Sequence, residues 1–207
     1  MAVSPVSVCS MALTRLGGQP IASLSEGSKE AILCSAFYEL SRDATLRDHP
    51  WNFATRRRAL AMLSSGGTDG DAAIPWAWIY GWPSDCLLAR RIHNPGSTTV
   101  AIPYEVALNS SGERVIYTDQ ATATLVYTTR VTDLTLCDPL FIEAMTWKLA
   151  TELAIPLTQD RGLMQVATTM YQNAIAKART LDANEGSADD LSQASWMEAR
   201  LGYQSLY

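Results

Sequence analysis

Hydrophobic residues recur at helical spacing near both ends of the sequence. Apolar side chains at positions i, i+3, i+4 and i+7 lie on one face of a helix, and serine or aspartate followed by proline is a typical helix start. These signals predict helices over residues 4–16, 28–47, 139–155 and 160–181. We expect Gly17-Gly18, Pro50 and Pro156 to end the first three of them.

The apolar positions within each predicted helix mark the face that we expect to be buried. Since helices are stable mainly when such faces pack together, the helices should form an antiparallel-type bundle of about four. The expected core positions are Val8, Met11, Ala12 and Leu16; Ile32, Leu33, Ala36, Phe37, Leu40 and Ala44; Phe141, Ala144, Met145, Leu149 and Leu153; and Val166, Ala167, Met170, Tyr171, Ala174 and Ala178.

The middle of the sequence follows a different pattern. From about residue 54 to residue 133, β-branched and aromatic residues, prolines and glycines replace the helical spacing. Strands are predicted over residues 57–63, 86–92, 104–108, 114–118 and 123–131. Residues 109–112 are expected to form a hairpin turn, and the glycine-rich residues 64–71 an exposed loop.

These elements predict an α+β fold with one module inserted into another. Residues 1–53 and 134–181 form a discontinuous helical bundle, and residues 54–133 form a β-rich module that closes as a barrel or packs as a sandwich. Residues 182–207 form an acidic C-terminal tail, which has too little apolar content to fold alone but enough to dock on a partner.

Composition narrows the classes of protein that fit. Of the 207 residues, 47% are hydrophobic and 18% are charged, so most of the chain is expected to fold. The net charge of −5 argues against affinity gained by neutralising phosphates. The sequence shows no apolar run long enough to cross a bilayer and no secretory signal at its start, so we expect folding in a cytosol and no membrane partner.

Residues able to carry catalysis or bind metal are scattered. His49 and His93 each stand alone, and the four cysteines, Cys9, Cys34, Cys86 and Cys137, contain no C-x-x-C pair. We interpret His49 as a helix-terminal cap or packing residue, His93 as a solvated turn residue, and the cysteines as small buried hydrophobes. The sequence therefore predicts no catalytic residue, no metal and no cofactor.

One enzymatic alternative stays open. Asp133 with Asp138, or Asp189 with Asp190, has the chemistry of the acid and base in glycoside cleavage. The aromatic segment of residues 76–82 has the composition of a sugar-stacking platform, although aromatics at a spacing of two more often pack one face of a strand against a core or a subunit.

Exposed aromatic and cationic residues are the candidates for a subunit or partner interface. Three adjacent arginines on a strand point alternately to its two faces, so we expect Arg56 and Arg58 to form salt bridges within or between chains and not a patch for nucleic acid. The candidate interface residues are Trp76, Trp78, Tyr80, Trp82, Arg56 and Arg58 in the β module and Trp196, Leu201, Tyr203 and Tyr207 in the tail.

A set of short motifs, in a fixed order along the chain, resembles a known family. The motifs are Ala12, Arg15, Gly17, Pro20, Ser23, Glu26 and Ser28; Cys34, Tyr38, Arg42-Asp43 and residues 46–54 (LRDHPWNFA); Tyr80, Trp82-Pro83 and Asp85-Cys86; and Tyr127, Val131 to Asp133, Pro139, Phe141, Ala144 and Leu149 to Thr158. They span about three-quarters of the chain and fade around Gly66 and after Leu181. In these residues the chain resembles the tail tubular protein A family, the head-to-tail adaptors of short-tailed bacteriophages.

The resemblance implies a structural, non-enzymatic function. It implies a dodecameric ring of identical subunits in the virion tail at the portal vertex, assembled in the host cytoplasm. Its partners would be other copies of the chain, the portal protein and a tail nozzle protein similar to tail tubular protein B, while genomic DNA passes through without specific binding. The alternatives are a virion-associated hydrolase of peptidoglycan or polysaccharide, and a small DNA-binding terminator of packaging, which the acidic charge disfavours.

Overall fold

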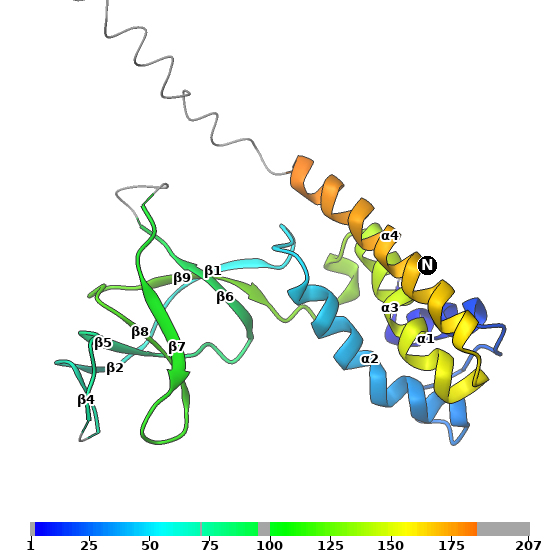
Figure 1. Ribbon diagram of the computed structural model, residues 1–207, viewed down its shortest axis with the longest axis horizontal. Helices are drawn as coiled ribbons and strands as arrows, with labels where there is room; N and C mark the ends of the chain where they lie inside the picture. Colours follow the sequence, from blue (N-terminus) through cyan, green and yellow to red (C-terminus); the bar gives the residue numbers. More distant parts are fainter. Residues whose placement is uncertain (1–2, 71, 95–99, 186–207) are drawn as a thin grey trace, which may run out of the picture.

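The computed structural model describes residues 3–70, 72–94 and 100–185, which form a helical part and a β part (Figure 1). The helices are α1 (Pro5–Arg15), α2 (Lys29–Arg47), α3 (Pro139–Thr158) and α4 (Arg161–Glu185), with a 3-10 helix at Leu134–Leu136 before α3. All the strands lie between α2 and α3 in the described sequence, so the prediction of a helical part interrupted by strands is confirmed. No helix within the described residues has the length and hydropathy needed to span a membrane.

Three helix starts are built as the sequence indicates. The side chains of Ser4, Ser28 and Asp138 each accept hydrogen bonds from backbone N–H groups in the first turn of α1, α2 and α3. Each cap satisfies a donor that has no partner inside the helix and contributes about 1 kcal/mol. Gly17, with φ of +78°, follows the end of α1, a position where glycine avoids the strain of a side chain.

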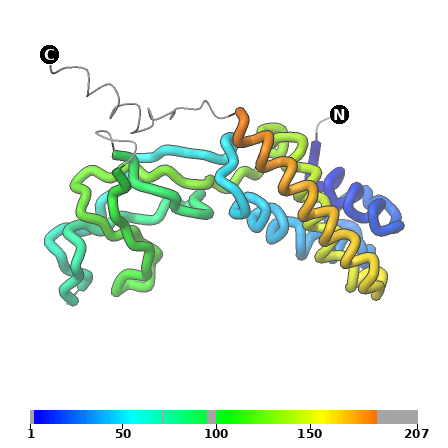
Figure 2. The backbone as a smooth tube through the Cα atoms, turned by 45° about the horizontal axis from the view of Figure 1, so that its top comes forward, coloured from blue at the N-terminus to red at the C-terminus, as the bar shows by residue number. Residues whose placement is uncertain are grey.

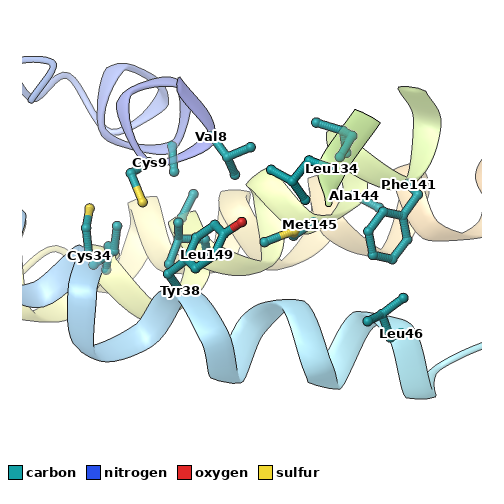
Figure 3. Close-up of a cluster of buried hydrophobic side chains, with 14 of the residues drawn as sticks. Val8, Cys9, Cys34, Tyr38, Leu46, Leu134, Phe141, Ala144, Met145 and Leu149 are labelled. Atoms are coloured by element: carbon teal, nitrogen blue, oxygen red, sulfur yellow. The ribbon is translucent and has the colours of Figure 1, made fainter. Parts of the chain in front are cut away.

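Helix α3 is the centre of the helical part. It packs against α1, α2 and α4. Its predicted core positions are all 0% exposed and join side chains from the other helices in one large cluster (Figure 3): Phe141, Ala144, Met145, Leu149 and Leu153. In the same cluster the buried thiols of Cys9 and Cys34 face each other, and all four cysteines are free, as expected.

The buried face of α2 differs from the predicted one. Ile32 and Leu40 of the predicted stripe are 60% and 67% exposed. The face that α2 buries consists of Ala31, Cys34, Tyr38, Ser41, Arg42, Thr45 and Leu46. Some of the polar side chains on this face have hydrogen-bond partners within the same helix. The Thr45 hydroxyl, for example, donates to the Ser41 carbonyl oxygen (2.8 Å). The prediction was therefore wrong for Ile32, Ala36, Leu40 and Ala44, which face outward. Leu33 and Phe37 are half-buried and pack against the core cluster, next to a buried face of small and polar residues.

Two predictions about α3 and α4 also need correction. Pro156 does not end α3, which continues to Thr158, because a proline in the last turn removes only one hydrogen bond. Helix α4 extends past Leu181 to Glu185, and Asp182 is buried. Of its predicted core positions, Val166 and Met170 are 57% and 40% exposed.

The strands form separate antiparallel sheets. The strands are β1 (Thr55–Ala59), β2 (Met62–Ser65), β3 (Thr68–Asp69), β4 (Ala72–Ala73), β5 (Trp78–Gly81), β6 (Cys86–Ile92), β7 (Tyr104–Leu108), β8 (Arg114–Thr118) and β9 (Thr124–Thr129). One sheet has the order β1-β9-β6, a second has the order β2-β5-β8-β7, and β3 pairs with β4. The predicted hairpin is the pair β7–β8, in which Tyr104 lies opposite Thr118.

Two details of the β part were predicted incorrectly. The single strand expected over residues 57–63 is divided into β1 and β2, which belong to different sheets. The stretch expected to be a loop, residues 64–71, contains the end of β2 and the strand β3, because the glycines at positive φ in this region make tight turns between short strands.

The two larger sheets share a hydrophobic cluster. Its buried members come from both sheets: Tyr80 and Ile116 from the four-stranded sheet, and Cys86, Ile92, Leu125 and Tyr127 from the three-stranded sheet, with Ala123 just before β9. The chain passes from one sheet to the other between β1 and β2, and an isolated bridge joins Ile92 to Ile102 at another point. The described strands do not form one closed sheet, so the predicted barrel is not confirmed. Figure 2 shows the β part beside one end of the helices.

Candidate functional site

The aromatic residues of the predicted interface lie mainly inside the β part. Trp78, Tyr80 and Trp82 belong to the cluster shared by the two sheets. Tyr80 is only 2% exposed, and its hydroxyl donates to the carbonyl oxygens of Gln120 (2.8 Å) and Ala121 (2.7 Å). The prediction that Tyr80 contacts a partner was therefore wrong, because its whole side chain is used within the chain.

The aromatic segment does not form one platform. Trp76 packs in a different cluster, with Ile79 and Tyr117, and its indole N–H donates to Glu105 Oε2 (2.8 Å). Trp82 is covered by the guanidinium of Arg114, which lies 3.7 Å from the ring centroid. The geometry agrees with packing against a core, the reading that the sequence favoured over sugar stacking. A partner contact by the partly exposed Trp76, Trp78 and Trp82 stays a prediction.

The two candidate arginines pair within the chain. Arg56 Nη1 lies 2.7 Å from Asp85 Oδ2, and Arg58 Nη1 lies 3.9 Å from Asp85 Oδ1. Both side chains thus project from the same face of β1, as alternation along a strand requires. Because each arginine side chain is about 60% exposed, each pair contributes at most about 1 kcal/mol.

Asp85 is the centre of a larger polar cluster. Its carboxylate also accepts hydrogen bonds from the hydroxyls of Tyr127 (3.1 Å) and Thr129 (2.9 Å). Burial alone would raise the pKa of Asp85, but the hydrogen bonds from Thr129, Tyr127 and Arg56 outweigh it and lower that pKa. Asp85 therefore stays ionised and fixes the start of β6 against β1 and β9.

The carboxylates of the enzymatic alternative have structural partners. Asp133 accepts from the backbone N–H and the hydroxyl of Thr135, and Asp138 caps α3. The second pair, Asp189 and Asp190, and the candidate tail residues Trp196, Leu201, Tyr203 and Tyr207 lie outside the described residues. Within the part of the chain that the structure describes, no three His, Cys, Asp or Glu side chains are grouped as metal ligands.

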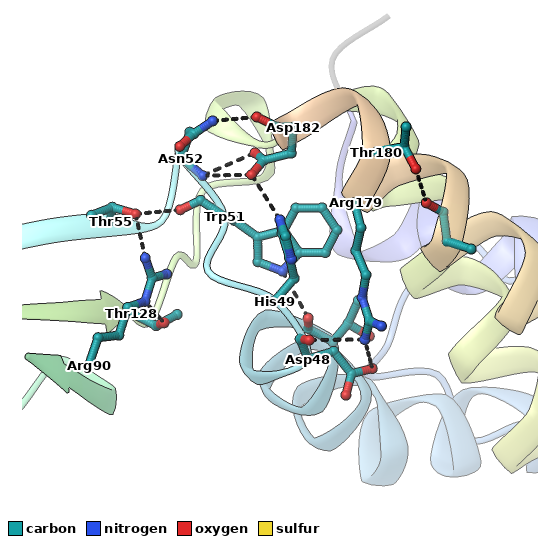
Figure 4. Close-up of polar contacts among 12 residues, drawn as sticks. Asp48, His49, Trp51, Asn52, Thr55, Arg90, Thr128, Arg179, Thr180 and Asp182 are labelled. Carbon is teal, nitrogen blue, oxygen red and sulfur yellow. Dashed lines mark hydrogen bonds and ion pairs between the residues drawn. The ribbon is translucent and has the colours of Figure 1, made fainter. Parts of the chain in front are cut away.

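His49 belongs to a network that joins two segments far apart in the sequence (Figure 4). Asp182, near the end of α4, lies 3.2 Å from His49 Nε2 and accepts a hydrogen bond from the Asn52 backbone N–H (3.0 Å). The Asn52 side-chain amide donates in turn to the Asp182 backbone oxygen (2.6 Å). These bonds attach the end of α4 to the segment between α2 and β1. Sequence reasoning missed Asp182 because the bonds connect residues 130 or more positions apart.

Further contacts reinforce this junction between the helices and the sheets. Arg179 donates to the Asp48 backbone oxygen (2.9 Å), and the Tyr171 hydroxyl donates to the Asp48 carboxylate. On the sheet side, Arg90 donates to the hydroxyls of Thr128 (2.9 Å) and Thr55 (2.8 Å). These contacts order each side of the junction, and others cross it: Arg47 of α2 donates to the Leu87 backbone oxygen in β6 (3.2 Å), and Arg130 pairs with Asp43 of α2 (2.9 Å).

The junction predicts a pH dependence of stability. Burial lowers the pKa of His49 below its ordinary 6.5, and the nearby Arg179 and Arg90 lower it further, while Asp182 opposes the shift. The unfolded chain therefore binds a proton more readily, so stability should be complete above about pH 7 and fall as the pH drops below about 6.5. Urea unfolding at several pH values measures the slope of the free energy of unfolding against pH, and His49→Gln should reduce this slope. An unchanged slope in that variant would assign the effect to other groups.

An apolar surface on α2 was predicted as core and is exposed instead. Ile32, Ala36, Leu40 and Ala44, spaced four residues apart, form what we call the α2 outer strip, and all four are exposed. Beside it, a groove of about 300 Å³ between α2 and α3 is lined by Phe37, Leu40, Ser41, Ala44, Lys148 and Glu152. Ser41 is 1% exposed, and its hydroxyl has no hydrogen-bond partner within the described chain. The lining therefore combines apolar side chains with the ion pair of Lys148 and Glu152 (2.9 Å).

No model of a known protein family matches the sequence. None of the curated proteins compared with it matches either.

Proposed function

We propose that this chain is a structural head-to-tail adaptor that forms a ring between the portal and the tail nozzle of a short-tailed bacteriophage. The proposal starts from the resemblance to the tail tubular protein A family. In the proposed role, the chain binds the portal protein, the nozzle protein and other copies of itself. It catalyses no reaction and lines a channel through which the genome passes.

The observation that carries the proposal is the role of the residues that resemble the family. His49, Trp51 and Asn52 meet at the junction, and Asp85 fixes the strands next to it. Asp43 pairs with Arg130, which links α2 to the end of the β part. These side chains hold a two-part scaffold together instead of gathering around a cleft, and a rigid scaffold is what a ring subunit under load requires.

The outward apolar surface is the second support. A ring subunit needs different contact surfaces on its two sides, because a heterologous interface repeats around a closed ring. The α2 outer strip supplies apolar area for such a contact without unfolding any part of the helical core. The net charge of −5 fits a channel from which phosphates are repelled.

Attachment to portal rings tests the proposal. The full-length chain should co-elute in size-exclusion chromatography with portal rings encoded by the same genome, and electron microscopy should show an added ring on them. A chain truncated after Glu185 tests whether the tail is required for attachment. Truncation after Leu181 is unsuitable, because it removes the buried Asp182 and weakens the fold itself. Absence of attachment, or turnover of peptidoglycan or polysaccharide by the pure chain, would contradict the proposal.

A further inference from the structure

We propose that the acidic beginning of the C-terminal tail, at Asp189 and Asp190, docks on the outer face of the three-stranded sheet of the same chain. The tail lies outside the described residues, and the sheet face that would receive it is described in full. The contact forms within one molecule, so the inference does not depend on the proposed ring.

The outer face of the sheet β1-β9-β6 follows from alternation along its strands. Leu125 and Tyr127 of β9 belong to the cluster between the two sheets, so Val126 between them points to the opposite, outer side. Arg57 of β1 and Arg91 of β6 are both paired in register with Val126. The two arginines therefore share the outer side of the sheet and flank β9.

This outer face carries positive charge that nothing nearby neutralises fully. The strands β1, β6 and β9 contain five arginines and no acidic residue. Arg57 and Arg91 are exposed, and among the residues that the structure describes neither guanidinium has a hydrogen-bond or ion-pair partner. Arg90 is held on the same side by threonine hydroxyls of β1 and β9, with Asp182 as its acidic neighbour. Like charges gathered on one face favour the approach of an anion.

The end of α4 lies close to the start of β1 (Figures 2 and 4). Asp182 in the last turn of α4 accepts a hydrogen bond from the Asn52 N–H (3.0 Å). Arg57 is five residues further along the chain than Asn52, a separation of at most about 18 Å. Asp189 follows Glu185, the last residue of α4, by four positions, which span up to about 14 Å. The first carboxylates of the tail are therefore within reach of Arg57.

The charge of the tail matches that of the sheet face. Residues 186–195 contain Asp189 and Asp190 and no basic residue. Arg57 and Arg91 lie on the two sides of β9, about 10 Å apart for strands spaced about 4.8 Å, so two neighbouring carboxylates can each reach one arginine. The covalent connection gives these carboxylates an effective concentration in about the millimolar range. A separate polyanion lacks this advantage, and the net charge of −5 disfavours the approach of nucleic acid.

Zero-length coupling of the full-length chain tests the contact. A carbodiimide joins an amine to a carboxylate that touches it, so Arg57→Lys and Arg91→Lys each place a reactive amine on the outer face and keep the positive charge. Peptide mass spectrometry should find the introduced amine joined to Asp189 or Asp190. The yield should be at least about fivefold higher than for Arg58→Lys, which places the amine on the opposite face of β1, beside Asp85.

Hydrogen exchange gives a second measurement that needs no coupling reaction. The backbone N–H groups of residues 187–192 should exchange about two- to fivefold faster in Arg57→Glu/Arg91→Glu than in the unaltered chain, because the reversed charges repel the tail. Both positions are exposed, so the fold should be retained. Arg161→Glu, a charge reversal at the other end of α4, is the matched control and should leave the exchange of these residues unchanged.

Several results would overturn the inference. One is a coupling yield no higher than that of Arg58→Lys. Another is coupling between light and heavy peptides in an equimolar mixture of isotopically light and heavy chains, which would assign the face to the tail of a second copy. A third is binding of duplex DNA near physiological salt that is lost in Arg57→Glu/Arg91→Glu, which would assign the face to phosphates. Each measurement uses the chain without portal rings, so portal attachment still tests the proposed function separately.

Discussion

Replacement of Trp51 by alanine should lower the free energy of unfolding by about 3–5 kcal/mol, the largest effect expected of any single substitution in this chain. Trp51 is 0% exposed and makes edge contacts with the rings of His49 (4.9 Å between centroids) and Phe141 (5.3 Å). Its indole N–H donates to the Thr45 backbone oxygen near the end of α2 (3.0 Å). Alanine leaves a cavity where the helical core meets the first strand. It also removes one of the hydrogen bonds that the Thr45 carbonyl oxygen accepts, while the one from the Asp48 N–H (3.3 Å) remains.

Urea unfolding of Trp51→Ala and Trp51→Phe measures the two contributions separately. Phenylalanine fills most of the space but cannot donate a hydrogen bond, so it should cost only about 1–2 kcal/mol. A loss below about 1 kcal/mol in the alanine variant would show that the surrounding rings collapse into the space, contrary to the tightly packed core described above.

Substitution of Asp182 by alanine should cost about 2–3 kcal/mol, the second largest effect. Asp182 is 7% exposed, and its removal leaves the Asn52 backbone N–H without an acceptor. His49 also loses its carboxylate neighbour. The end of α4 should then separate from the junction, so hydrogen exchange should accelerate in the last turns of α4 and around Asn52 before it changes in α3.

Asp182→Asn is the matched variant for this prediction. It keeps one oxygen that can accept from the Asn52 N–H, so most of the stability should remain, and the pH dependence assigned to His49 should change because the negative charge is lost. Equal stability losses for the alanine and asparagine variants would mean that the charge, and not the hydrogen bond, holds the junction.

The sequence predicted α3 well and α2 poorly, for a physical reason. Helix α3 is covered on several sides, so its apolar positions, such as Phe141 and Leu149, coincide with its buried positions. Helix α2 carries two competing faces. The inward one contains Ser41 and Thr45, whose polarity hides it from a search for apolar spacing, and the outward one contains Ile32 and Leu40.

The candidate site was predicted only in part. The pairing of Arg56 and Arg58 with an acidic neighbour follows from alternation along a strand, which a single sequence reveals. The partnership of Asp182 with Asn52 depends on how α4 returns to the start of β1, and no local pattern encodes that path. Tyr80 was misassigned to an interface because periodicity does not distinguish a strand covered by its own chain from one covered by a partner.

The number of chains bound per portal ring tests the central claim most directly. Native mass spectrometry of the complex formed by the full-length chain and intact portal rings gives this number without labelling. A ring-forming adaptor predicts one fixed stoichiometry, a full dodecamer of this chain on each portal ring, with no partly filled species accumulating when the chain is in excess. A chain that binds no portal, or that binds in variable numbers without completing a ring, would contradict the account.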